Sequence, residues 1–300
     1  MTSSSIDIDA ACDFVWHEAR LLDRRRLALL RGDEAAAAAV NAALRAYQNP
    51  DGGFGNALEP DLRTPLSQPQ PAEFALRVLD ETGELPADVI EALCDWLGTV
   101  TTRQGGVPFV LPSAMRHPHA PWWAAPEDPD ADLNPTAAIV GMLLKHEVAH
   151  GWLGPAVDFC WRTIEAGEQP DEVHAFVAAF TFLEYVPDRP RAERAAERLG
   201  QRLVAEGHVT LDPEAEGYVH GPLQVAEGPD ALAAGVFAPA AIEAAVDGLA
   251  AKQLPDGGWP ITWSPPSDAA VCEWRGAVTV DALRRLVTWG RVDPDAVGAP

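Results

Sequence analysis

The sequence predicts an all-α fold of about five to six helical hairpins, joined by long Gly- and Pro-rich loops. Apolar residues recur at helical spacing along most of the 300 residues, and alternating strand patterns are almost absent. A glycine-rich signature also occurs twice, as QNPDGGFG from Gln48 and as QLPDGGWP from Gln253, each time where a helical pattern stops. A repeat of this kind is typical of stacked or ring-closed helix pairs.

Ten segments carry the helical pattern. They cover residues 12–31, 34–48, 71–82, 88–100, 135–149, 153–166, 171–185, 190–205, 238–252 and 277–290. Boundary residues support this division, because an Asn-Pro pair begins one segment at Asn134 and glycines such as Gly83 follow helix ends. Only 106–110 and 207–211 read as short strands. We expect one domain over 8–292, with flexible termini at 1–7 and 293–300.

The repeat continues between the two clear copies. Residues 104–109 (QGGVPF) look like a degenerate copy that has lost its aspartate, and 207–211 falls near a further step of about 51 residues. Each part of the signature has a structural use. The glycines permit a turn with positive φ, the glutamine amide can bond backbone groups at a neighbouring helix end, and the ring covers the joint.

The amino-acid composition disfavours some classes of binding partner. With 22 basic and 45 acidic residues the formal charge is −23, which disfavours nucleic acids and anionic lipid surfaces. No apolar run reaches the ~20 residues of a membrane span, and no signal-peptide pattern opens the chain, so a cytoplasmic protein is expected. The sequence is compatible with either a monomer or a homo-oligomer. The four cysteines are scattered, which disfavours disulfides or a zinc site, and three of them lie in apolar helical contexts that predict buried thiols, namely Cys12, Cys94 and Cys160.

Gln-x-x-Asp-Gly-Gly followed by Phe or Trp, recurring between helical hairpins, resembles the QW-type repeat of the terpenoid cyclase and protein prenyltransferase superfamily. The resemblance covers roughly residues 12–290. It implies an α/α toroid in which inner helices are surrounded by outer ones, with the long loops at one rim. It also implies a small, apolar ligand, such as an isoprenoid, in a central cavity.

The resemblance suggests a catalytic acid. In class II terpene cyclases the acid is the middle aspartate of an Asp-x-Asp-Asp-Thr-Ala stretch at an inner helix start. This chain has DADLNPTA from Asp130, which places Asp132 at the acid and Asp130 beside it as a modulator. Leu133 stands where the family has a further aspartate, and Thr-Ala follows two residues late. No cofactor is implied, unless a diphosphate substrate requires Mg²⁺.

The substrate-binding residues implied by this reading come from the long loops. Protonating an alkene requires an acid kept protonated in apolar surroundings, beside aromatic rings that can stabilise a cation. The predicted aromatic wall and the polar residues near it are Trp122, Trp123, Trp263, Trp274, Glu59, Asp61 and Arg275.

Two alternatives belong to other functional classes. A non-catalytic toroid would bind a ligand or partner and leave the acidic stretch 127–132 solvated. A carbohydrate-active α/α barrel would use two carboxylates across a cleft, taken from Glu59, Asp61, Glu214, Glu216 or Glu273.

Two zinc patterns also occur. A prenyltransferase-like site would need Asp268, Cys272 and His220 or His174, although Asp268 and Cys272 are separated by three residues rather than one. Residues 146–150 (HEVAH) match the His-Glu-x-x-His pattern of metalloproteases. Gly151 is expected to end that helix at once, so no metal is predicted.

Overall fold

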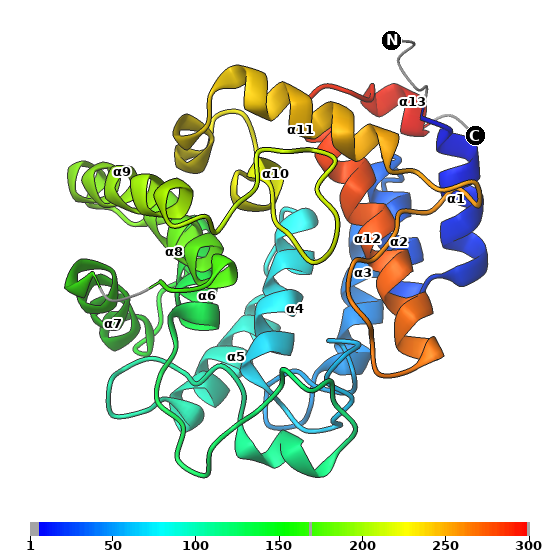
Figure 1. Ribbon diagram of the computed structural model, residues 1–300. Helices are drawn as coiled ribbons and strands as arrows, with labels where there is room; N and C mark the ends of the chain where they lie inside the picture. Colours follow the sequence, from blue (N-terminus) through cyan, green and yellow to red (C-terminus); the bar gives the residue numbers. More distant parts are fainter. Residues whose placement is uncertain (1–5, 168–169, 299–300) are drawn as a thin grey trace. The chain divides into compact units, whose positions relative to one another are not determined.

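The chain is all helical in the computed structural model, which describes residues 6–167 and 170–298. Within these ranges there are thirteen α-helices, three 3-10 helices and no β-strand (Figure 1). The all-α prediction is therefore confirmed. The chain divides into two compact units, a central unit of residues 44–208 and a terminal unit formed by the chain up to 43 and from 209 onwards. Ring closure into a toroid, and a single domain over 8–292, remain predictions.

The central unit contains three helices that lie side by side (Figure 1). These are α4 (Pro69–Glu81), α6 (Leu133–Lys145) and α8 (Val173–Tyr185). Almost every residue of α6 is buried, and an added Cβ at Gly141 would lie 2.4 Å from the carbonyl oxygen of Thr181. Glycine therefore permits the close approach of α6 and α8. The remaining elements are η1 (Arg45–Tyr47), α5 (Ala87–Val100), η2 (Pro112–Arg116), α7 (Leu153–Ala166) and α9 (Arg189–Ala205).

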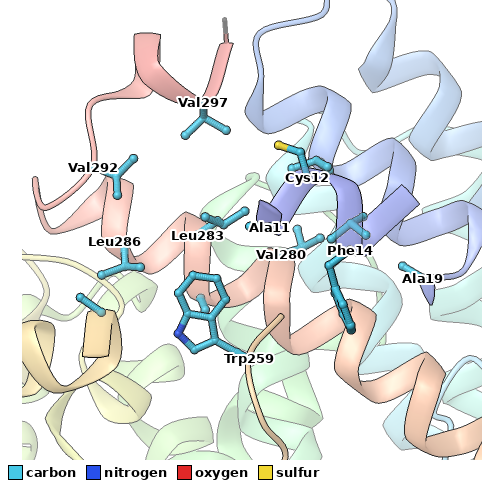
Figure 2. Packing of buried hydrophobic residues seen from close by; sticks show 14 of the residues in the cluster. Ala11, Cys12, Phe14, Ala19, Trp259, Val280, Leu283, Leu286, Val292 and Val297 are labelled. Atoms are coloured by element: carbon cyan, nitrogen blue, oxygen red, sulfur yellow. The ribbon is translucent and has the colours of Figure 1, made fainter. Parts of the chain in front are cut away.

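The terminal unit is built around the long helix α12 (Asp268–Thr288), which packs against α1 (Ile8–Glu18), α2 (Leu21–Leu30) and α11 (Pro239–Ala251). Trp259 is 1% exposed and lies in the apolar core with Phe14 of α1 and Val280 and Leu283 of α12 (Figure 2). Its indole N–H donates to the Leu249 carbonyl at 2.8 Å, which satisfies the buried donor. The other elements are α3 (Ala36–Leu44), α10 (Pro222–Val225), η3 (Leu232–Val236) and α13 (Pro294–Gly298).

Two helix predictions differ from the structure. The segment 12–31 forms two helices rather than one, because the backbone adopts an extended conformation at Ala19. An added Cβ at Gly276 would lie 2.4 Å from the Cβ of Ala19, so α12 packs against this break. Helix α12 also begins earlier than predicted, at Asp268, where the Ser267 side chain accepts from the Ala270 N–H at 3.2 Å. That serine is an ordinary N-cap signal.

The two predicted strands do not form. In the part of the chain that the structure describes, the only β pairings are isolated bridges, Gln48 with Phe54 and Leu62 with His119. At 106–110 the reason is local. The Val107 N–H donates to the Thr136 hydroxyl at 3.0 Å, and this hydroxyl donates back to the Val107 carbonyl at 3.1 Å. The Thr136 side chain of α6 thus forms the hydrogen bonds with Val107 that a neighbouring strand would otherwise form.

The predicted flexible ends are partly ordered. Asp7 caps α1 by accepting from the Ala10 N–H at 2.9 Å. Within 293–300 the short helix α13 buries Val297, which is 1% exposed. Residues 1–5 and 299–300 lie outside the described ranges.

Candidate functional site

The two clear copies of the glycine motif form the same backbone turn. The Asn49 N–H donates to the Gly53 carbonyl at 2.8 Å, and the Gly52 N–H donates to the Asn49 carbonyl at 2.9 Å. The second copy repeats both bonds between Leu254 and its two glycines, each at 2.9 Å. The aromatic residues that follow, Phe54 and Trp259, are both buried.

Each turn lies directly on a helix of its own unit. An added Cβ at Gly52, whose φ is +93°, would lie 2.1 Å from the Ala92 carbonyl oxygen of α5. An added Cβ at Gly257, with φ +90°, would lie 2.1 Å from the Ala10 carbonyl oxygen of α1. Only glycine fits such a position, both for its φ and for the space. Helix α1 therefore stands to the second motif as α5 stands to the first.

The second glycine of each pair lies against an aromatic ring one helical turn further along the same helix. An added Cβ at Gly53 would lie 2.6 Å from the Trp96 ring, and one at Gly258 would lie 2.7 Å from the Phe14 ring. In both helices the ring comes four residues after the contacted carbonyl, so the two contacts share one helix face.

The motif glutamines join the turn to the start of the helix. Gln48 Nε2 donates to the Gly52 carbonyl at 3.0 Å and to the Val89 carbonyl of α5 at 3.3 Å. Gln253 Nε2 donates to the Gly257 and Asp7 carbonyls, while its Oε1 accepts from the Asp7 N–H at 2.8 Å. The predicted use of the glutamine amide is confirmed.

The degenerate third copy is real, but its alignment must be corrected. The Thr102 N–H donates to the Gly106 carbonyl at 2.9 Å and the Gly105 N–H to the Thr102 carbonyl at 3.0 Å, as in the other copies. Thr101 therefore stands where the clear copies have glutamine, and Gln104 stands where they have aspartate. The copy has lost its glutamine, not only its aspartate. An added Cβ at Gly105 would lie 2.8 Å from the Pro155 carbonyl oxygen of α7.

The stretch 207–211 does not reproduce this packing. Gly207 has φ +75°, but an added Cβ would meet nothing within 4 Å. It is an ordinary left-handed turn after α9.

In each copy, the side chain before the glycines contacts a later helix of the same unit or the residues that lead into it. Asp51 Oδ1 accepts from the Ser67 hydroxyl at 2.7 Å, just before α4. Gln104 Oε1 accepts from the Ala131 N–H at 2.7 Å, just before α6. Asp256 forms two hydrogen bonds with Arg275 of α12, at 2.8 and 2.9 Å. The motifs thus place the N-terminal parts of α4, α6 and α12.

Polar side chains from the starts of α4, α6 and α8 meet in the central unit. Gln70 Nε2 donates to Asn134 Oδ1 at 3.0 Å, and Asn134 Nδ2 donates to Glu172 Oε1 at 3.4 Å. Asp132 accepts from the Asn134 N–H at 2.9 Å and caps α6. Glu172 caps α8 by accepting from the Ala175 and His174 N–H groups. We call Gln70, Asp132, Asn134 and Glu172 the N-terminal polar cluster, because they lie at the N-terminal ends of these three helices.

The surroundings of Asp132 change the pKa of its carboxyl group. Burial raises the pKa of the Asp132 carboxyl, and the charges of Glu172 and Asp171 raise it further, against the lowering effect of the Asn134 N–H bond. Asp130 is exposed, and the carboxylates that modulate Asp132 come from the start of α8. A carboxyl with a raised pKa can serve as a proton donor closer to neutral pH than an ordinary aspartate.

Gln70, Asn134 and Glu172 are not among the site residues that the sequence predicts. A signal was present, because each is a polar residue at the start of an apolar helical run, where N-caps occur. This local signal does not indicate that the starts of α4, α6 and α8 lie close together.

The predicted residues Glu59, Asp61, Trp122 and Trp123 lie in loops of the same unit. The Ala120 N–H donates to the Asp61 carbonyl at 2.9 Å, which joins the two loops. Glu59 and Asp61 are buried, at 9% and 2% exposed. Trp123 is also buried and stacks on Phe109 with ring centroids 4.9 Å apart, so it belongs to a small loop core. Trp122 is 46% exposed and is available to a ligand.

The remaining predicted residues lie in the terminal unit. Trp263 and Trp274 are in contact, with ring centroids 5.1 Å apart and planes at 83°. Arg275 forms an ion pair with Asp256 of the second motif. Its guanidinium carbon also lies 4.4 Å from the centroid of the Phe14 ring. These contacts give Arg275 a structural role in the joint.

The metalloprotease-like pattern does not form a metal-binding helix face. Helix α6 ends at Lys145, and Glu147 has a left-handed φ of 54°. His146 Nε2 lies 2.7 Å from Asp80, and His150 Nε2 lies 3.2 Å from Asp95. Across residues 6–167 and 170–298, no group of three or more His, Cys, Asp or Glu side chains could hold a metal ion.

Comparison with known proteins assigns no family. No protein-family model matches the chain, and no curated protein matches it significantly. Among the described helices, none has the combination of length and apolar character that crossing a membrane requires.

Proposed function

We propose that this chain is a terpenoid-cyclase-like enzyme in which Asp132 donates a proton to an apolar, isoprenoid-type small molecule. The observation that carries the proposal is the N-terminal polar cluster, in which a partly buried aspartate with a raised pKa lies among side chains from three helix starts. The substrate class comes from the resemblance of the glycine motifs to the QW-type repeat.

The surroundings of Asp132 in this cluster favour a role as general acid over a role as general base. Glu172 accepts two backbone N–H bonds and one from the Asn134 amide, which together fix the position of its carboxyl group at the start of α8. Burial raises the pKa of the Asp132 carboxyl, and the nearby Glu172 raises it further, which favours the protonated form of Asp132. Two carboxyl groups in one site thus have different surroundings, which is how one of them becomes the proton donor.

The direct test is incubation with farnesyl and geranylgeranyl diphosphates and with squalene, followed by mass spectrometry of the products. Asp132→Asn should lose at least about 100-fold of the turnover, as expected when a general acid is removed. Asparagine still caps a helix, so this variant retains the α6 start. Asp128→Asn is the matched control, because Asp128 is an exposed carboxylate of the same loop. If the wild-type protein converts none of these substrates, the isoprenoid proposal fails.

A carbohydrate-active site is the second candidate, and one observation favours it. Asp132 and Glu172 are two carboxyl groups that interact within one site, as acid-base pairs of glycosidases do. Aryl glycosides that release a chromophore separate the candidates. Hydrolysis that requires both Asp132 and Glu172 would establish the sugar enzyme in place of the isoprenoid one.

A further inference from the structure

Four aromatic side chains of the terminal unit form one continuous cluster. Tyr218 contacts His220 with ring centroids 4.9 Å apart and Trp263 at 5.9 Å, and Trp263 contacts Trp274 at 5.1 Å. All three contacts are close to perpendicular, with interplanar angles of 89°, 80° and 83°. The rings come from three parts of the chain, which are the loop before α10, the loop before α12 and α12 itself. We call these residues the aromatic cluster.

The cluster is accessible, unlike the apolar core of the same unit. Tyr218 is 55% exposed, whereas Trp259 of the core is 1% exposed. Trp263 and Trp274 are half-buried. The loop that carries Tyr218 also exposes Leu211 and Val219, and it is closed by the Thr210 N–H donating to the His220 carbonyl at 2.8 Å. Aromatic surface is thus held in a defined loop and left open to a ligand.

The chain around these rings is negatively charged. The segments 209–221 and 260–274, which contain all four rings, include no lysine or arginine. They carry five carboxylates, which are Asp212, Glu214, Glu216, Asp268 and Glu273. The nearest arginine in sequence, Arg275, is paired with Asp256. An anionic ligand would be repelled here, and a cation would be attracted both by the carboxylates and by the ring faces.

We propose that the aromatic cluster binds a small organic cation of the quaternary-ammonium type. Such a cation presents methyl groups to the rings and has a diffuse charge that aromatic faces attract. Because the rings contact one another edge to face, the cation would lie against their outer, solvent-facing surface, next to the exposed Tyr218. The site uses residues of the terminal unit alone and does not depend on proton donation by Asp132.

Choline is the probe, and 3,3-dimethylbutan-1-ol, which has the same shape without the charge, is the matched ligand control. Binding is followed by NMR through the indole N–H signals, assigned with tryptophan-to-leucine variants. Choline should shift the Trp263 and Trp274 signals saturably, and sodium chloride at equal ionic strength should not. The neutral alcohol should bind at least about threefold more weakly, since it lacks the cation–π attraction.

The variants test the location. Trp263→Leu should weaken choline binding by about 3- to 30-fold, and Tyr218→Leu, at an exposed position, should act in the same direction without affecting folding. Tyr218→Phe, which keeps the ring, should bind like wild type. Trp16→Leu is the control, because Trp16 is an exposed tryptophan outside the cluster. The proposal is overturned if no probe shifts the signals, if choline and the alcohol bind equally, if Trp16→Leu has the effect of Trp263→Leu, or if a hexose binds there and choline does not.

Discussion

Gly257 lies against the backbone of Ala10, so closely that an added Cβ would come within 2.1 Å of the Ala10 carbonyl oxygen. The C-terminal glycine motif is thereby seated on the first helix of the chain, in the same way that Gly52 is seated on α5. A motif late in the sequence uses a helix from the beginning as its outer neighbour. The contact joins the two ends of the chain within the terminal unit.

Substitution of this glycine should be severe. Gly257→Ala adds both a steric clash and an unfavourable φ of +90°, and we expect it to lower the free energy of unfolding by roughly 2–4 kcal/mol. Gly32→Ala separates the two effects, because Gly32 has φ +77° but nothing within 4 Å of an added Cβ. It should cost only about 1 kcal/mol. Urea denaturation measures both, and equal losses would contradict the close contact.

Arg26 should be essential to the terminal unit. It is 3% exposed and pairs with Asp23, which is 0% exposed, at 3.1 Å and with Asp281 at 2.5 Å. Arg26→Leu leaves the buried Asp23 with Arg20 as its remaining cationic partner at 2.9 Å, so a loss of about 2–3 kcal/mol is expected. Arg25→Leu, at the neighbouring half-exposed position, should change stability by no more than about 0.5 kcal/mol. A small effect of Arg26→Leu in thermal and urea unfolding would contradict the pairing.

The raised pKa of Asp132 gives a pH-dependent stability. The folded protein binds this proton more tightly than the unfolded chain, so stability is lost as pH rises from the ordinary value of 3.8 through the raised folded value. Asp132→Asn cannot ionise and keeps the cap. Its unfolding midpoint should therefore exceed that of wild type at pH 7, and the difference should disappear below about pH 4. A variant less stable than wild type at pH 7 would contradict this.

The four cysteines should differ in reactivity. Cys12, Cys94 and Cys160 are buried, and burial raises the pKa of the Cys94 thiol to about 12 and raises that of Cys160 as well. Cys272 is exposed, although partial burial and Glu18 raise its pKa. An aromatic disulfide reagent should therefore modify one thiol in the native protein, slowly, and four in denaturant. Cys272→Ser should remove the native reaction. Modification of a second native thiol would show that the cores open.

The helices were predictable because their signals are local. Segments such as 88–100 and 153–166 carry complete amphipathic patterns, and the structure has α5 and α7 there within one residue. The missed start of α12 had a local signal in Ser267, but two other errors arose where a distant contact decided the outcome. The break at Ala19 coincides with the approach of Gly276, more than 250 residues later, and no local pattern announces it. The predicted strand at Val107 failed because Thr136 supplied its hydrogen bonds.

The candidate site was only partly predictable. Asp132 could be singled out by resemblance, but Glu172, which helps to raise its pKa, comes from a helix start 40 residues later. Its proximity depends on how closely α6 and α8 pack, which Gly141 permits. Similarly, Trp263 and Trp274 lie near each other in the sequence, but the contact of Trp263 with Tyr218 could not be inferred from spacing.

The sequence alone determined that this protein is helical and that glycine turns recur where helices end, because helical periodicity and φ preferences are properties of neighbouring residues. The tertiary structure decided which helix each turn rests on, which copy had lost its glutamine, and which charges surround Asp132. Those outcomes depend on side chains far apart in the chain, whose distances are set by packing.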